Sequence, residues 1–449
     1  MEINEFKNKL FIKAKEFGYS EFEIYCLIED ASSIEIFENK VDKYSLNKRI
    51  GISFRGNVKG KMGYSYTEAI DEMSIDMLLS KAFENAEIVD DHIEPIYAGK
   101  GTYKKLNNYS ESLVKITDER KIEFGKALEE RAKKISSKII RSEVMISSTE
   151  NKKYIYNSKG LGLSHKKNSL LITVEVVASD RDKMYCYYSY KYCKSLKEED
   201  IDFIAKEAVE GALACINGDS VASGKYAVIL KNEAAIDMLE TFSGIFSSDN
   251  VQKGLSLLKS TLGKEIGSKV LTIIDNPLLA EGLMSSPFDS EGVPTYSKEV
   301  VKAGELKTLL YNLKTALKDG VNSTGNGFRT NYTSPIEVAP SNFYIEPGRL
   351  SYLELIQELK EGLVINELQG LHSGANPISG DFSLAAKGFL VKKGNIVGAV
   401  EQITISGNFY RLLKDIKAVG ADMKFGMASG KGSFGSPSIL IKEVSISGK

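Results

Sequence analysis

IIRSEVMISSTENKKYIYNSKGLGLSHKKNSLLITVEVVASDRDKMYCYYSYKYC, residues 139–193, alternates runs rich in Ile, Val and Tyr with polar turn residues such as Asn157-Ser-Lys-Gly160. This pattern is typical of antiparallel β structure. The strands predicted from it are Ile139–Ser147, Lys152–Asn157, Ser169–Ala178 and Met184–Cys193. A helix from Ile201 to Cys215 follows, so residues 114–219 are predicted to form a middle α+β domain.

The segment upstream, residues 1–88, is predicted to form an N-terminal α/β domain. An apolar stripe over residues 6–17 indicates a helix that ends at Gly18, and a second apolar helix face covers residues 75–86. Between these helices, short strands are expected at Tyr19–Glu29, Ser32–Phe37 and Ile50–Phe54. Residues 89–113 have no clear period and are interpreted as a linker.

Residues 220–449 are predicted to form a β-rich C-terminal domain, because clusters of Gly, Ser, Thr and Asn separate its short apolar runs. The domain opens with a strand at Tyr226–Leu230, followed by a helix with an apolar face over residues 235–246. A capping box at Ser351 and Glu354 predicts a further helix. The whole chain is therefore assigned to the α+β class.

The composition is that of a globular protein of 449 residues and disfavours several classes. Lys and Arg total 59 against 60 Asp and Glu, and no long basic stripe is present, so nucleic-acid binding is disfavoured. The N-terminus MEINEFKNKLFIKAKEFG mixes acidic residues with lysines, unlike a signal peptide. No window approaches the roughly 18 apolar residues of a membrane helix. A cytoplasmic protein without a membrane partner is expected.

Histidine is scarce, because only His92, His165 and His372 occur in the sequence. No two of them have the spacing of three or four residues that lets one helix present both side chains to the same zinc ion. The four cysteines include no CxxC pair, which is typical of thiols in a reducing compartment. A helix with two zinc-binding histidines is therefore excluded.

Three carboxylates, Glu233, Asp237 and Glu240, share one face of the helix that follows Tyr226–Leu230. Hard cations such as Mg²⁺ take oxygen ligands of this kind. The same spacing is also typical of a solvated helix face, and the neighbouring sequence supplies no further carbonyl or phosphate partner. A cation site and a plain polar face both remain open at this point.

Two glycine-rich segments lie near the C-terminus. Gly430-Lys-Gly-Ser-Phe-Gly435 matches the dinucleotide pattern GxGxxG, but a β-like run follows where a helix is needed, so a plain loop is predicted. Glu367–Ser383 is rich in Gly, Ser and Asn, and either binds a ligand or forms a structural turn. A serine nucleophile at Ser383 or Ser433 would need His372 as its base.

Several segments together resemble the TldD/PmbA family. They are ELQGLHSGANPISGDFSLAAKGF (367–389), VEQITISGN (400–408), VGAD (419–422), SPFDSEGVPT (286–295), NLKTA (312–316) and STGNG (323–327). The motifs span much of the chain, and as a set they are far more specific than one short pattern.

The resemblance implies a division of labour between two kinds of subunit. TldD-type subunits carry an HExxxH helix whose histidines, with a later cysteine, bind zinc, and whose glutamate serves as general base. PmbA-type subunits, also called TldE, lack these ligands and pair with TldD. The complex is associated with the trimming or degradation of small unfolded peptides.

In this chain the zinc helix is degenerate in either possible alignment. Asn232-Glu-Ala-Ala-Ile-Asp237 and Leu239-Glu-Thr-Phe-Ser-Gly244 each keep the glutamate, Glu233 or Glu240, and replace both histidines. Residues 426–435 contain no cysteine. The match is therefore to the PmbA/TldE branch, with no metal or cofactor expected in this chain and zinc expected in a TldD-type partner.

The expected partners are a TldD-type subunit in a heterodimer, or a second copy in a homodimer, with a small unfolded peptide as substrate. The loop expected to contact substrate or partner carries His372, Asn376, Ser379, Gly380, Asp381 and Asn408. Two alternatives stay open. One is a self-sufficient peptidase with a cation bound by Glu233, Asp237 and Glu240, and the other is a homodimeric scaffold without catalysis.

Overall fold

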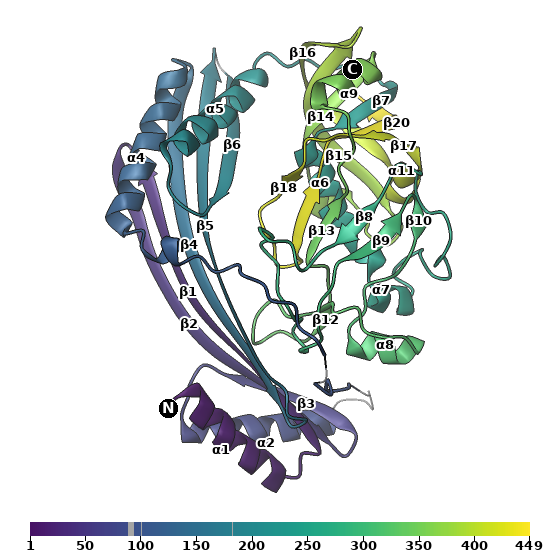
Figure 1. Ribbon diagram of the computed structural model, residues 1–449. Helices are drawn as coiled ribbons and strands as arrows, with labels where there is room; N and C mark the ends of the chain where they lie inside the picture. The colour runs from purple at the N-terminus through teal and green to yellow at the C-terminus, as the bar shows by residue number, and fades with distance from the viewer. Residues whose placement is uncertain (89–93, 100, 182) are drawn as a thin grey trace. The chain divides into compact units, whose positions relative to one another are not determined.

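The computed structural model describes residues 1–88, 94–99, 101–181 and 183–449 (Figure 1). The chain divides into two compact units. Unit 1 comprises Met1–Gly99, Asn107–Ile216 and Asn331–Ser334, and unit 2 comprises Lys100–Leu106, Asn217–Thr330 and Pro335–Lys449. His92 and the start of the predicted linker, residues 89–93, lie outside the described residues.

An antiparallel sheet organises unit 1. Within the described ranges its strands follow the order β3-β2-β1-β4-β5-β6. They are β1 Glu21–Phe37, β2 Lys40–Val58, β3 Lys61–Thr67, β4 Ile139–Asn157, β5 Gly162–Asp180 and β6 Lys183–Cys193. Because β1 pairs with β2 on one side and β4 on the other, strands from residues 1–88 and 114–219 share this sheet. The domain boundaries near residues 88, 113 and 219 stay sequence-based predictions, whereas the α+β class is confirmed.

Two pairs of predicted strands are each joined into one strand in the structure. The pattern separates residues 19–29 from 32–37 and residues 139–147 from 152–157, whereas the structure has the continuous strands β1 and β4. The polar residues between these runs include Asp30 and Glu150, which lie opposite each other in the β1–β4 ladder. Pairing along the full length satisfies their backbone groups and outweighs the weak strand propensity of polar residues.

Helices pack against this sheet in two places. α1 Ile3–Glu16 and α2 Glu72–Ile88 share a buried core with β1 and β2, and α4 Asp118–Ile135 and α5 Glu198–Ala214 share another with β1, β4, β5 and β6. The short helix α3 spans Glu111–Val114. Buried residues alternate with accessible ones along the second half of β5, so one face of this part of the sheet is covered by α4 and α5.

We call the opposite side of β5 and β6 the open face. Its side chains are Leu171, Thr173, Glu175, Val177 and Ser179 on β5, which pair across the ladder with Tyr192, Tyr190, Tyr188, Cys186 and Met184 on β6. These side chains are only partly buried or exposed. The open face therefore carries an aromatic row along β6.

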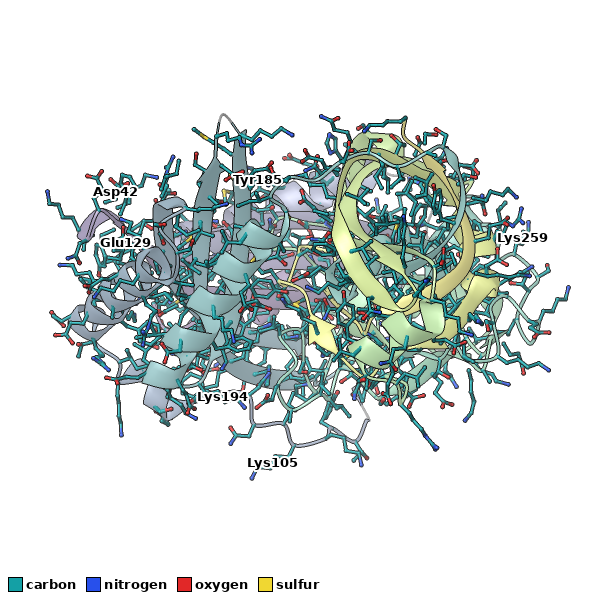
Figure 2. The ribbon with its side chains drawn as sticks, turned by 90° about the horizontal axis from the view of Figure 1, so that it is seen from above. Asp42, Lys105, Glu129, Tyr185, Lys194 and Lys259 are labelled. Carbon is teal, nitrogen blue, oxygen red and sulfur yellow. The ribbon has the colours of Figure 1, made fainter. Side chains whose placement is uncertain are left out.

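A buried carboxylate fixes the turn between β1 and β2. Glu129 of α4, labelled in Figure 2, accepts the backbone N–H groups of Glu38 (3.0 Å) and Asn39 (2.8 Å). Both turn residues have positive φ, 50° and 59°. The contact ties the helix layer to the end of the sheet, because a charged acceptor forms stronger hydrogen bonds than a neutral one.

Unit 2 combines a barrel with a second sheet. The barrel strands follow the order β16-β15-β14-β7-β20-β17, and an additional pairing of β16 with β20 closes the barrel. They are β7 Gly224–Leu230, β14 Gly362–Gln369, β15 Asp381–Lys392, β16 Asn395–Asn408, β17 Ile416–Val419 and β20 Ile439–Ser447. The second sheet comprises β8 Ile273–Asp275, β9 Lys298–Lys302, β10 Glu305–Leu306, β13 Asn342–Ile345, β18 Lys424–Phe425 and β19 Ser433–Ser436, and the short strands β11 Gly327–Phe328 and β12 Glu337–Val338 form a separate pair.

The helices of unit 2 surround these sheets. They are α6 Asn232–Phe242, η1 Ser243–Phe246, α7 Ser248–Gln252, α8 Leu313–Asp319, α9 Tyr352–Leu359, α10 Leu371–Gly374 and α11 Phe409–Asp415. α6 packs against β14 and β19 in the hydrophobic core of unit 2. The capping box predicted at Ser351 and Glu354 is confirmed at the start of α9. In the described ranges, no helix has both the length and the apolar character needed to cross a membrane.

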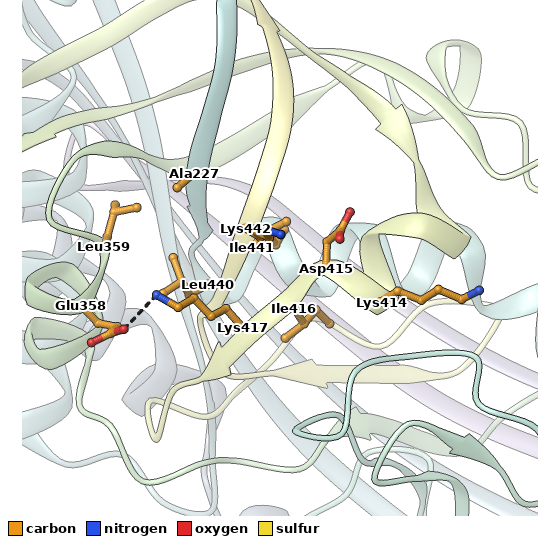
Figure 3. A pocket seen from close by; sticks show the side chains of 10 residues that line it. All are labelled: Ala227, Glu358, Leu359, Lys414, Asp415, Ile416, Lys417, Leu440, Ile441 and Lys442. Carbon is orange, nitrogen blue, oxygen red and sulfur yellow. Dashed lines mark hydrogen bonds and ion pairs between the residues drawn. The ribbon is translucent and has the colours of Figure 1, made fainter.

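A pocket of about 470 Å³ lies on the barrel beside α9 and β17 (Figure 3). Apolar residues such as Leu359 and Leu440 line it together with three lysines. One of these, Lys417, forms an ion pair with Glu358 at 3.0 Å. Nothing in the lining distinguishes a ligand site from an ordinary surface depression.

A buried polar network joins β8 and β9 to the loops around them. The Asp275 carboxylate accepts from Lys298 Nζ (3.0 Å), Asn326 Nδ2 (2.8 Å) and the backbone N–H of Ser341 (2.7 Å). Lys298 Nζ also donates to Asn326 Oδ1 (3.1 Å). Asp275 and Lys298 are 0% and 7% exposed, so each charge depends on these partners to offset the cost of leaving water.

Lys298→Met is expected to lower the free energy of unfolding by about 3–5 kcal/mol, because the Asp275 carboxylate then stays buried without its cation. Lys302→Met, at the other end of β9, removes an exposed ion pair with Glu299 and is expected to cost at most about 1 kcal/mol. Urea unfolding followed by circular dichroism measures both losses. Equal losses in the two variants would contradict the role assigned to the network.

Candidate functional site

Strand β7 determines where helix α6 begins. β7 pairs in parallel with β14 and antiparallel with β20. Directly after β7, the backbone N–H of Lys231 donates to the Ile365 carbonyl of β14 (2.8 Å), and the chain then turns into α6. The apolar face of α6 is buried, as the sequence pattern predicts. Its other face is left to carry the three carboxylates.

Glu233, in the first turn of α6, is held by two lysines. Its Oε1 lies 2.7 Å from Nζ of Lys424 in β18, and its Oε2 lies 3.5 Å from Nζ of Lys231. The side chains of Glu233 and Lys424 are 23% and 20% exposed, so their ion pair is largely shielded from water. In one alignment Glu233 takes the place of the general base, and here that carboxylate is already neutralised by an ammonium group.

Asp237, one turn further along α6, has a different environment. Among the described residues, no hydrogen bond or ion pair involves its side chain. Burial, followed by the nearby charges of Glu240, Glu233 and Glu367, raises the pKa of Asp237 to about 7. Glu367, in β14, is itself paired with Lys387 at 3.3 Å. Asp237 therefore carries a proton for part of the time at neutral pH.

The donor set around α6 does not fit zinc. Structural zinc sites are tetrahedral and built mainly from cysteine and histidine, and catalytic ones also keep histidine ligands. The α6 face presents carboxylates instead, and lysines pair with Glu233 and with Glu367 beside it. Across the described parts of the chain, no group of three His, Cys, Asp or Glu side chains is arranged to hold a metal ion.

The two alignments of the degenerate zinc motif place their end positions differently. In the first, Asn232 Nδ2 donates to the Asp422 carbonyl (3.2 Å). The other end position is Asp237, whose pKa is raised by burial and by the neighbouring carboxylates. In the second, Leu239 is buried in the core and Gly244 lies beyond α6, in η1. The first alignment keeps both end positions on α6, whereas the second does not.

The loop at residues 376–381 is a turn fastened to the start of α11. Asn376 Oδ1 accepts the backbone N–H groups of Ile378 (3.0 Å) and Ser379 (3.2 Å). Asn408, the N-cap residue of α11, donates through Nδ2 to the Ser379 carbonyl and to Asp381 Oδ1, both at 2.8 Å. The hydrogen bond from Asn408, followed by one from Ser379, lowers the pKa of Asp381. These contacts bring four of the predicted loop residues together.

Gly380 completes this turn, and His372 lies outside it. Gly380 has a φ of 83°, and a Cβ there would lie 2.6 Å from the Tyr410 ring. His372 is exposed in the short helix α10. No hydrogen bond among the described residues joins His372 to Ser383 or Ser433, so the arrangement gives no support to a serine nucleophile.

The central motifs of the family resemblance meet in space although they are far apart in sequence. Asp289 Oδ2 accepts the backbone N–H of Gly327 (2.9 Å), and Glu291 Oε2 accepts that of Leu313 in the first turn of α8 (2.8 Å). Both acidic residues are buried. These carboxylates hold three separate segments together, namely the loop at residues 286–295, the start of α8 and β11, so the motifs have a structural role here.

Sequence reasoning overlooked two features of unit 2. Lys424 follows the VGAD motif closely, but no local pattern links it to Glu233, 191 positions earlier. The buried pair of Asp275 and Lys298 is likewise formed only by the fold. The plain loop predicted at Gly430–Gly435 is only partly right, because residues 433–435 belong to the buried strand β19. The β-like run predicted after it is confirmed as β20.

Comparisons with known proteins agree with the motifs. Family models match the PmbA/TldA metallopeptidase domain 1 at residues 22–86, the central domain at 111–216 and the C-terminal domain at 223–448. A crystal structure from Thermotoga maritima, described as a candidate modulator of a DNA gyrase, is 34% identical with a TM-score of 0.91, covering 99% of this chain and 100% of that chain. TldE from Thermococcus kodakarensis is 20% identical with a TM-score of 0.89 over 99% and 100% of the two chains, and shows the same fold.

Curated relatives give the same result. Metalloprotease PmbA of Escherichia coli O157:H7 is 28% identical over 336 residues, which are 74% of this chain and 71% of the relative. A protein named Metalloprotease from Archaeoglobus fulgidus is 28% identical over 409 residues, which are 89% of this chain and 91% of that protein. The three family models together cover most of the sequence. The chain belongs to the PmbA/TldD metallopeptidase family.

Proposed function

We propose that this chain is the metal-free, TldE-like subunit of a cytoplasmic metallopeptidase complex, and that a TldD-type subunit supplies the zinc. The complex trims or degrades small unfolded peptides. The observation that supports this most strongly is the contact between Lys424 and Glu233 at 2.7 Å. The family is named for metallopeptidases. In this chain, however, the α6 glutamate Glu233 contacts an ammonium group.

A lysine cannot perform the chemistry that zinc supplies. Bound zinc lowers the pKa of a water molecule to about 7 and polarises the carbonyl that is attacked. The ammonium group of Lys424 is a hydrogen-bond donor without an open coordination position. Glu233 binds two lysines instead of a water molecule that a metal has activated. Hydrolysis therefore depends on the partner.

The contribution of this chain is then to bind the peptide substrate and to orient it in the cleft of the partner. Its α6 face and the turn at residues 376–381 are rigidly supported, since β7, β14 and α11 hold them. Such preorganised surfaces suit a subunit that encloses the cleft of a partner and excludes water from it. Small unfolded peptides are the substrates that the family resemblance implies, and an extended peptide of this kind can bind through its backbone without a fixed sequence.

The purified chain alone is expected to show no chelator-sensitive cleavage of an unstructured peptide, because its α6 face binds lysines and not a catalytic metal. A zinc-loaded TldD-type protein is expected to cleave the peptide faster when this chain is added. Cleavage is followed by mass spectrometry of the peptide products. Lys302→Met, far from α6 in sequence and on an exposed strand end, is the control for the α6 variants Glu233→Gln and Glu240→Gln.

The alternative of a self-sufficient peptidase predicts the opposite result. Turnover by the chain alone that a chelator stops, and that Glu233→Gln or Glu240→Gln abolishes, would overturn the subunit proposal. A stable homodimer that ignores every TldD-type protein, and that leaves peptide cleavage unchanged, would favour the scaffold alternative instead.

Asp237→Asn is expected to stabilise the protein at pH 8 and to have little effect at pH 4. The folded pKa of about 7 lies above the ordinary value of 3.8, so the folded state binds the proton more tightly than the unfolded state. The free energy of unfolding therefore falls as pH rises from about 3.8 to about 7, by about 1.4 kcal/mol per pH unit. The amide variant avoids that loss. Thermal unfolding from pH 4 to 8 measures the difference.

Asp249→Asn is the matched control, because Asp249 pairs with Lys253 on the surface at 2.6 Å. It is expected to leave the pH profile of stability unchanged. The profile of the wild type is expected to stay the same when MgCl₂ is added. A profile that flattens in MgCl₂ would instead show a cation bound among the carboxylates of α6.

A further inference from the structure

The sheet of unit 1 carries polar residues between its two hydrophobic cores. On the side of β1 that faces the helices, Cys26 belongs to the core under α1 and α2, and Ile34 belongs to the core under α4 and α5. Figure 1 shows these two pairs of helices at opposite ends of the sheet. Because side chains alternate along a strand, Asp30 and Ser32 point to the same side as Cys26 and Ile34, and they lie between the two cores.

A pocket of about 420 Å³ occupies this gap between the cores. Two rows of polar residues form its floor. Asp30 lies opposite Glu150 in the β1–β4 ladder, and Ser32 lies opposite Ser148 in the next row on the same side. A pocket of this size, with apolar walls and a few polar groups, is typical of a small-molecule site.

The walls of this pocket are apolar, and its floor offers hydroxyl groups. Leu46 of β2 and Val114 of α3 line it and are 70% and 56% exposed, and Ile116 also contributes to the lining. In the described parts of the chain, no hydrogen bond involves the side chain of Ser32 or Ser148. Both hydroxyl groups can therefore donate to a ligand whose apolar side chains contact the walls.

One end of the pocket is acidic. Asp30 forms an ion pair with Lys48 at 3.5 Å, but the two side chains are 43% and 80% exposed, so this pair is weak. Glu150 pairs with Lys152 at 2.9 Å and accepts from the hydroxyl of Tyr109 at 3.1 Å. Lys152, together with the Tyr109 hydroxyl, lowers the pKa of Glu150, so this carboxylate is charged at neutral pH. Two carboxylates in one row favour an ammonium group on the ligand.

A buried ammonium group lies at the other end. Lys121 of α4 lines the pocket and is 6% exposed, and its Nζ donates to Asp118 Oδ1 at 2.9 Å. Asp118 Oδ2 in turn accepts from the hydroxyl of Tyr44 at 2.5 Å, and Tyr44 lies two residues from Leu46 along β2. An ammonium group has three N–H donors, and the described residues provide an acceptor for one of those of Lys121. The other donors favour a carboxylate on the ligand.

We propose that this pocket binds a short zwitterionic peptide with apolar side chains, its ammonium group at Asp30 and Glu150 and its carboxylate at Lys121. The two rows of the floor are about 7 Å apart, and the Tyr44 contact holds the Lys121 ion pair beyond the second row. A free amino acid is too short to reach both ends, whereas an extended dipeptide spans about 7 Å.

The backbone of such a peptide also matches the floor of the pocket. Its carbonyl group, which lies between the two charged ends, can accept from the hydroxyl of Ser32 or Ser148. Every residue used in this inference belongs to unit 1, whereas α6 belongs to unit 2. The inference is therefore independent of the proposed function.

Isothermal titration calorimetry of the purified chain with the dipeptide leucyl-leucine tests the proposal. We expect one dipeptide per chain, with a dissociation constant on the order of 0.1–1 mM. N-acetyl-leucyl-leucine lacks the ammonium group and leucyl-leucine amide lacks the carboxylate, so each is expected to bind about ten-fold more weakly. Failure of leucyl-leucine to bind, or equal affinity for all three compounds, would overturn the proposal.

Asp30→Asn tests the location of the site. It removes a charge and keeps the shape of the side chain, so it is expected to weaken the binding of leucyl-leucine about ten-fold and to leave that of N-acetyl-leucyl-leucine unchanged. Asp42→Asn, at an exposed residue of β2 outside the pocket (Figure 2), is the matched control and is expected to bind like the wild type. Circular dichroism verifies that both variants fold.

An unchanged affinity in Asp30→Asn, or an equal loss in Asp42→Asn, would show that the peptide does not bind in this pocket. Both experiments use the chain without a TldD-type protein and without measuring cleavage. Their failure would therefore leave the proposed function standing.

Discussion

The pairing of β7 with β14 on one side and β20 on the other is the constraint on which the α6 region depends. It fixes the last residue of β7 inside the barrel, so α6 has to begin at Asn232, and the apolar face of α6 has to turn toward the core. The carboxylates are then left on the remaining face. β18 brings Lys424 to that face from the far end of the sequence.

This geometry gives the α6 face a fixed balance of charge. Glu233 and Glu367 are each paired with lysines, while burial and the nearby charges of Glu240, Glu233 and Glu367 raise the pKa of Asp237. Ammonium groups and the raised pKa of Asp237 thus offset the cost of gathering carboxylates on this face. This balance of charge is what the proposed metal-free role of the chain rests on.

The sequence predicted much of this architecture. The apolar spacing of α6, the capping box of α9 and the β-rich middle segment are local patterns, and the structure has them where the sequence places them. The continuous strands β1 and β4 could not be predicted, because pairing partners far away in sequence decide whether Asp30 and Glu150 form turns or strand.

The candidate site was only partly predictable for the same reason. The three carboxylates share a helix face by spacing alone, and the polar residues of the loop at 376–381 stand out in composition. Two further features depend on contacts between distant segments. One is the lysine that lies against Glu233, and the other is the closure of the loop on α11 by Asn408. The aromatic edge of β6 was visible as a strand, but its position at the end of the sheet was not.

In the proposed function, Lys424, and not a metal ion, neutralises Glu233 of α6. Crystals of the chain soaked in zinc chloride, with diffraction data collected on both sides of the zinc absorption edge, test this claim directly. We expect no anomalous density at α6, with Lys424 Nζ still in contact with Glu233. An anomalous peak within bonding distance of Glu233, with Lys424 displaced, would contradict it.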